Sequence, residues 1–208
     1  MMTSSILPTH PENFAKLKCP PSTIICREKT IILGDVTIGP DCVVHPTARI
    51  IARNGPIRIG SNNLIEERVT IINNFTEPMI IGDNNVFEVY SQCETRTMGS
   101  NNIIECKAFV GSEIELTNNC IVGAGCQLPH RRTQAAEDKS EHREQRQAPI
   151  DVFKPNTEVY GSDLHRRVVQ DLPASSHGSQ LDFLRKILPN YQKLWRPANL
   201  PATPPTQR

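Results

Sequence analysis

The chain has 208 residues, enough for one ordinary domain with additional segments. Its formal net charge of +1 provides no field that would attract nucleic acid or an anionic membrane surface. Aromatic residues make up only 5% of the chain, which indicates a thin and repetitive core. We find no signal-peptide pattern and no apolar stretch of roughly 20 residues, so a cytoplasmic location without direct membrane insertion is expected.

The seven cysteines are an odd number, and no two of them form a CxxC pair. This usage is typical neither of a disulfide framework nor of a zinc site, so we expect reduced thiols. Four of them fall inside the apolar repeat described next, where a thiol packs as a small hydrophobic side chain: Cys42, Cys93, Cys120 and Cys126.

Residues 1–17 carry no repeat and are predicted to form a disordered N-terminal extension. From Ile24 to Leu128, an aliphatic residue recurs every six positions, interrupted by short insertions at 53–56 and 73–78. Three six-residue sides make one coil, so residues about eighteen apart should stack. The expected stacks are Cys26, Val44, Ile65, Phe87, Ile104 and Val122; Ile32, Ile50, Ile71, Cys93, Val110 and Leu128; and Ile38, Ile59, Ile81, Met98 and Leu116.

This period predicts an all-β fold, a parallel β-helix with three-sided coils over residues 18–165. An α-helix would require a 3.6-residue stripe, and a β-sandwich would require longer alternating strands joined by hairpin turns. Neither pattern is present, so the solenoid is the interpretation that fits.

One corner of each coil carries a glycine directly after the buried aliphatic residue, followed by a pair of asparagines. Asparagine tolerates left-handed backbone and bonds to its own backbone in turns. Because successive coils lie about 4.8 Å apart, the second asparagine of each pair should stack on its equivalents. The predicted amide ladder consists of Asn63, Asn85 and Asn102.

A polar tract follows the repeat at 129–148, with both signs of charge and almost no apolar residue. We expect it to be a disordered loop within the β-helix domain, with a charged binding tail as the alternative. Residues 150–161 regain strand and turn character and are predicted to finish the last coil.

A single helical pattern covers residues 179–195, where Ser179 and Asp182 resemble a capping box. Pro189 should end or kink this helix after Leu188. The apolar face is predicted to pack on the chain's own β-helix, with docking of a partner as the alternative, and residues 196–208 are expected to be a disordered tail. The packing face consists of Leu181, Leu184, Ile187, Leu188, Tyr191 and Leu194.

The solenoid offers little catalytic chemistry, since His45 is the one histidine inside the repeat and a zinc site needs three or four ligands. His45 follows a buried position and is expected to be an exposed corner residue. Glu66, Glu88 and Glu105 recur on successive coils, as a repeat produces by itself, and are interpreted as an acidic stripe. We therefore predict no catalytic residue, no metal and no cofactor; the alternatives are a divergent γ-carbonic-anhydrase-like or acyltransferase enzyme, or an inactive homotrimer.

Several motifs resemble the dynactin subunit six family. The most specific is the helical segment 180–191, which is not a repeat; the others are 34–40 (GDVTIGP), 84–89 (NNVFEV) and 98–105. The resemblance covers roughly residues 24–194, although the 129–148 tract is longer and the 73–78 loop shorter than in the family.

The resemblance implies a left-handed β-helix and a structural subunit of the pointed-end complex of dynactin, the activator of dynein. It further implies a heteromeric assembly with dynactin subunit five, other pointed-end subunits and the end of the actin-related protein filament. Filament-end capping, cargo or adaptor binding and support of microtubule-based transport in the cytoplasm and cytoskeleton would follow, without catalysis.

Overall fold

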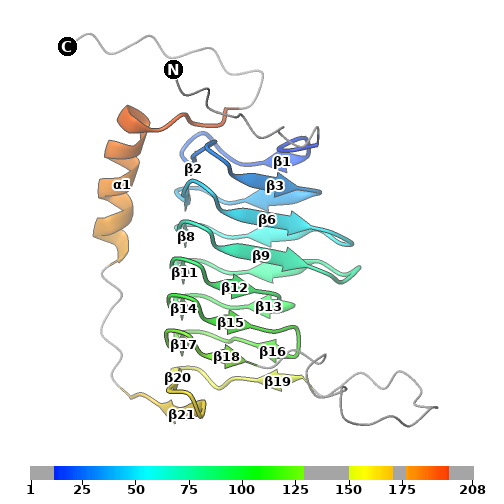
Figure 1. Cartoon of the computed structure of the whole chain (residues 1–208), viewed down its shortest axis with the longest axis vertical. Coiled ribbons are helices and arrows are strands. Elements are labelled where there is room, and N and C mark those ends of the chain that lie inside the picture. Colours follow the sequence, from blue (N-terminus) through cyan, green and yellow to red (C-terminus); the bar gives the residue numbers. More distant parts are fainter. Residues whose placement is uncertain (1–11, 129–149, 171–176, 197–208) are drawn as a thin grey trace, which may run out of the picture.

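The computed structural model describes residues 12–128, 150–170 and 177–196. These residues form a left-handed parallel β-helix with one helix, α1 (His177–Tyr191), lying along its side (Figure 1). The predicted fold class is confirmed. Within the described residues, no helix is long and apolar enough to span a membrane.

The three faces of the solenoid are three sheets whose strands run parallel apart from β21, because each coil contributes one short strand to each face. The first sheet contains β1 (Leu17–Lys18), β4 (Val36–Ile38), β7 (Ile57–Ile59), β10 (Met79–Ile81) and β13 (Thr97–Met98). The second contains β2 (Ile24–Ile25), β5 (Val43–Val44), β8 (Leu64–Ile65), β11 (Val86–Phe87), β14 (Ile103–Ile104), β17 (Ile121–Val122), β20 (Thr157–Tyr160) and β21 (His165–Val168). The third contains β3 (Ile31–Leu33), β6 (Arg49–Ala52), β9 (Thr70–Asn73), β12 (Gln92–Cys93), β15 (Phe109–Val110) and β18 (Gln127–Leu128), and a separate pair joins β16 (Ile114–Glu115) to β19 (Asp151–Val152).

The register of the strands stacks the predicted aliphatic columns inside the solenoid. Phe87, for example, pairs with Ile65 on one side and Ile104 on the other, and all three are fully buried. One predicted position is wrong: Ile25, not Cys26, pairs with Val44. The first coil has one additional residue before its next turn, so Cys26 faces outward and packs beneath α1 instead.

The corners of the coils combine left-handed backbone with very close packing. The first asparagine of each predicted pair has positive φ, at 55° in Asn62, 57° in Asn84 and 60° in Asn101. The preceding glycine serves a different purpose, because a Cβ on Gly82 would lie 2.7 Å from the carbonyl oxygen of Gly99. Side chains are therefore excluded where consecutive coils touch.

The described boundaries differ from the predicted ones at several points. Leu17, which was expected in a disordered extension, belongs to β1 and packs in the core, and Phe14 packs against that core. Strands β19 and β20 complete the last coil, and β21 then returns antiparallel to β20, which the sequence did not indicate. Residues 1–11, the tract at 129–149 and the tail at 197–208 lie outside the described residues.

Candidate functional site

The three predicted ladder asparagines lie in one fully buried column at a corner of the solenoid. The Oδ1 atom of Asn63 accepts the backbone N–H of Asn85 at 2.8 Å, and Oδ1 of Asn85 accepts that of Asn102 at 2.8 Å. Oδ1 of Asn102 accepts the N–H of Cys120 at 2.7 Å. Each side chain therefore satisfies a buried main-chain donor of the next coil.

The amide nitrogens of the same column donate to main-chain oxygens of the following coil. Nδ2 of Asn63 donates to the Gly82 carbonyl at 2.9 Å, and the Nδ2 atoms of Asn85 and Asn102 make equivalent bonds. The column also extends beyond the asparagines, because the Sγ of Cys42 donates to the Gly60 carbonyl at 3.1 Å. Sequence reasoning missed this member, although Cys42 stands at the corner position that Asn63 occupies in the next coil.

Burial raises the pKa of the Cys42 thiol to about 11. The thiol therefore stays protonated near neutral pH and remains a donor, weaker than an amide but of suitable size. This environment is that of a structural cysteine and not of a nucleophile.

The glutamates of the predicted acidic stripe each bind the main chain of the next coil. One carboxylate oxygen of Glu66 accepts the N–H of Val89 at 3.1 Å, that of Glu88 accepts the N–H of Cys106 at 3.0 Å, and Glu105 makes the equivalent bond to Ala124 at 2.8 Å. Each glutamate thus satisfies a turn donor that would otherwise face solvent or a neighbouring side chain. The stripe is built into the turns of the solenoid.

His45 does not occupy the exposed corner that the sequence suggested. Its side chain is only 13% exposed, and its Nδ1 lies 2.8 Å from Oε1 of Glu67. Its Nε2 is buried and has no hydrogen-bond partner among the described residues. Burial raises the pKa of the adjacent Glu66 carboxyl. The described residues nevertheless contain no group of three histidine, cysteine or acidic side chains placed to hold a metal ion.

Helix α1 packs its apolar side against the outer face of the second sheet (Figure 1). Leu181 and Leu188 are buried there against Val43, Leu64 and Val86. From the predicted face, the half-buried members that join this cluster are Leu184, Ile187 and Leu194.

Several details of the helix prediction are wrong. The helix begins at His177, so Ser179 lies inside its first turn and is not the N-terminal cap of the predicted capping box. The helix runs through Pro189 to Tyr191, and Tyr191 is 81% exposed, so it does not belong to the packing face. Tyr191 ends α1, and from Lys193 onward the chain runs beside β2 as an extended segment, which removes the last predicted turn. Pro189 lies in the last turn of α1.

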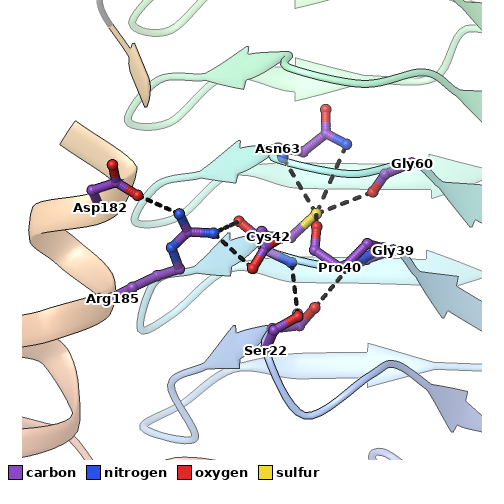
Figure 2. A network of polar contacts seen from close by, with 10 residues as sticks. Ser22, Gly39, Pro40, Cys42, Gly60, Asn63, Asp182 and Arg185 are labelled. Carbon is purple, nitrogen blue, oxygen red and sulfur yellow. Dashed lines mark hydrogen bonds and ion pairs between the residues drawn. The ribbon is translucent and has the colours of Figure 1, made fainter. Parts of the chain in front are cut away.

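A polar contact fixes α1 at the level of the second and third coils. The guanidinium of Arg185 lies 2.8 Å from the carboxylate of Asp41 and also bonds Asp182 on its own helix (Figure 2). Arg185 is three-quarters buried, so the bridge is better shielded than a surface ion pair. The same turn leads directly into Cys42 of the buried column, so the helix contact and the ladder meet there (Figure 2).

The chain covers the N-terminal end of its own solenoid. The N–H of Trp195 donates to the carbonyl of Ile25 at 2.8 Å, and Leu194 forms an antiparallel bridge with Cys26. The rings of Phe14 and Trp195 stack with their centroids 6.2 Å apart. Segments from the two ends of the sequence therefore close the same end of the molecule.

Exposed apolar side chains remain in two main places. One is α1, where Phe183 is 59% exposed and Tyr191 is 81% exposed. The other is the terminal coil, which exposes Ile150, Val152, Tyr160 and Val168. These two surfaces are candidate interaction features of the molecule.

No protein-family model matches the chain. Among solved structures, a hexapeptide transferase family protein from Anaplasma phagocytophilum is similar with a TM-score of 0.57 and 14% identity, covering 84% of this chain and 88% of that chain. At this identity the likeness shows the hexapeptide-repeat fold alone.

Curated relatives are much closer in sequence. Dynactin subunit 6 of Xenopus tropicalis is 44% identical over 199 residues, covering 90% of this chain and 89% of the relative. Dynactin subunit 6 of Danio rerio is 44% identical over 200 residues, covering 90% and 92%, and that of Caenorhabditis elegans is 34% identical over 175 residues, covering 84% and 86%. The chain therefore belongs to the dynactin subunit 6 family.

Proposed function

We propose that this protein is a non-catalytic structural subunit of the pointed-end complex of dynactin. In this role it supports dynein-driven transport along microtubules by contributing to filament-end capping and to cargo or adaptor binding. The observation that carries the proposal is the 44% identity to dynactin subunit 6 over 90% of the chain, which extends well beyond the repeat.

The geometry of the solenoid supports a scaffolding role. Its corner side chains commit their polar atoms to the main chain: the asparagine amides and the glutamate carboxylates bind the next coil. Such a column is rigid, since every coil is tied to its neighbours on three faces and at two corners. A rigid body with exposed apolar patches is suited to holding other chains at fixed positions.

The proposed partners are dynactin subunit five, the other pointed-end subunits and the end of the actin-related protein filament, in the cytoplasm and on the cytoskeleton. The decisive experiment is affinity purification of the tagged protein from cells, followed by sedimentation and mass spectrometry. We expect the protein to sediment with the large complex and its subunits in fixed stoichiometry. A protein found solely as a free monomer or homotrimer would contradict the proposal.

An enzymatic function is the second candidate, and one observation favours it: the buried Nε2 of His45, next to the carboxylates of Glu66 and Glu67. A histidine with a free ring nitrogen is the usual general base. We expect the purified protein to show neither stoichiometric zinc nor carbon dioxide hydration or acyl transfer. Zinc-dependent activity that disappears in a His45→Ala variant, and persists in Arg185→Ala as the matched control, would favour the enzyme instead.

A further inference from the structure

The two ends of the solenoid differ in how the chain covers them. At the N-terminal end, residues 193–195 lie along the edge of β2, and the N–H of Phe14 donates to the carbonyl of Ile32 in β3. At the C-terminal end, β21 covers β20, but no described residue pairs with the outward edge of β18 or β19. Among the described residues, the N-terminal end leaves the outward edge of the two-residue strand β1 unpaired, and the last coil leaves those of β18 and β19 unpaired.

Exposed apolar side chains gather at the same end. Half of the large apolar side chains that are exposed in the described residues belong to this coil, and Val152 and Val168 are more than half exposed. Single exposed apolar residues are ordinary, but a cluster beside an unpaired strand edge marks an interaction site.

A groove of about 270 Å³ lies between β19 and β21. We call it the terminal groove; Val152 and Val168 line it together with Phe153. The guanidinium of Arg166 lies 4.3 Å from the centre of the Phe153 ring and 2.6 Å from the carboxylate of Asp151, which holds one wall in place. The groove is therefore formed before anything binds.

The charges around the terminal groove select the kind of occupant. Three cationic side chains line it, and two of them are paired: Arg166 with Asp151 and Arg167 with Glu158. Lys154, which is exposed, forms no ion pair among the described residues. The ammonium group of Lys154 therefore gives this rim of the groove its positive charge. An occupant with acidic residues beside an apolar side chain matches both the charge and the walls.

Two occupants from this chain itself fit poorly. The tract at 129–149 contains no valine, isoleucine, leucine, methionine or aromatic residue to fill the apolar part of the groove. A second copy bound about a two-fold axis would bring like-charged grooves together. A complete coil of another solenoid is also blocked, because β21 already covers the second sheet.

We propose that the terminal groove binds an extended segment of another dynactin subunit, in which an apolar side chain is flanked by acidic residues. The segment adds as a strand along the edge of β19, and its apolar side chain enters between Val152 and Val168. This proposal rests on the proposed membership of the complex and identifies the face that is used.

The test uses the full chain with a benzophenone amino acid at position 152 or 168, incorporated into native dynactin in cells. We expect photocrosslinks from both positions to an acidic segment of another subunit, identified by mass spectrometry. The matched control is the same amino acid at Phe183, which is similarly exposed on the other apolar surface. Crosslinks to residues 129–149 of the same chain, crosslinks solely from position 183, or no crosslinks at all would each overturn the proposal.

Two substitutions provide a second readout in the same purification. Val152→Asp should lower the fraction of protein that sediments with the complex about tenfold, as expected for a central contact, whereas Phe183→Asp should leave it unchanged. Lys154→Glu should weaken incorporation more than Lys193→Glu, which reverses an exposed charge at the opposite end. Melting curves equal to that of the unmodified protein establish that each variant folds.

The controls separate the two proposals. If the unmodified protein fails to sediment with the complex, membership itself is refuted. If it does sediment with the complex and Val152→Asp does so equally, membership stands and the terminal groove is not the contact.

Discussion

Replacing Asn85 by alanine removes three side-chain hydrogen bonds from the middle of the buried column. In the native protein, Nδ2 donates to the Gly99 carbonyl at 3.0 Å, and Oδ1 accepts from both the N–H and the Nδ2 of Asn102, at 2.8 Å and 3.0 Å. The variant removes the side-chain partner of the Gly99 carbonyl and of the Asn102 N–H and creates a small cavity, whereas Nδ2 of Asn102 keeps its bond to the Thr117 carbonyl.

Each buried polar group left unsatisfied costs about 1–3 kcal/mol. The Gly99 carbonyl and the Asn102 N–H are both affected, so we expect the free energy of unfolding to fall by about 3–5 kcal/mol in total. That is a large part of the roughly 5–15 kcal/mol that stabilises an ordinary domain.

The assay is urea unfolding followed by circular dichroism, with Asn84→Gly as the matched control. Asn84 is the exposed neighbour in the same turn and has a φ of 57°, which glycine adopts without strain. We expect the control to remain within about 0.5 kcal/mol of the unmodified protein. A loss below about 1 kcal/mol for Asn85→Ala, or equal losses for both variants, would refute a stabilising role for the asparagine ladder.

The turns of the solenoid carry three further predictions. Gly82→Ala should lower the melting temperature by several degrees, because the new Cβ would lie 2.7 Å from the Gly99 oxygen. The control Gly178→Ala has open space around its Cβ and should not destabilise the protein. Equal melting temperatures for the two variants would contradict this prediction. Burial raises the pKa of Glu66 above its ordinary value of 4.5, so the folded state binds more protons than the unfolded state between the two pKa values, and stability falls as the pH rises through that window. Calorimetry from about pH 4 to 7 should therefore show a weaker decline for Glu66→Gln, and parallel curves would refute the assignment. The Glu88 carboxylate accepts a hydrogen bond from the Cys106 thiol at 3.2 Å and raises the pKa of that thiol. Glu88→Gln should therefore speed the reaction of Cys106 with Ellman's reagent at neutral pH. An unchanged rate would show that this contact does not control the thiol.

The core of the solenoid could be predicted from the sequence because its period is local and strict. A residue such as Phe87 is placed by its spacing from Ile65 and Ile104, and the register then follows. Cys26 was misplaced because the first coil has one additional residue, so its buried aliphatic residue lies seven positions before Ile32 and not six. No earlier coil precedes it in the repeat, so the sequence offered no stack that would have shown the shift.

The roles of individual polar side chains were harder to predict from the sequence than the buried aliphatic stacks. The glutamate stripe was visible as a repeat, but the N–H groups that it binds, such as that of Val89, are defined by how consecutive turns overlap. His45 was expected at the surface because the repeat shows that its side chain points away from the core. The repeat does not show what lies next to that side chain. In the structure, Glu67 of the next coil contacts His45, whose side chain is largely buried. Tyr191 was assigned to the packing face by helical period alone, whereas α1 ends at Tyr191 and the following residues run beside β2.

The closure of the N-terminal end by residues 193–195 has a consequence for synthesis on the ribosome. The edge of β2 and the outer apolar face of the second sheet appear early, but the segment that covers them is made almost last. At typical translation rates this leaves them uncovered for roughly 10 s or more. We expect the nascent chain to need protection from aggregation during this interval, and a protein truncated before α1 to depend on chaperones throughout its life.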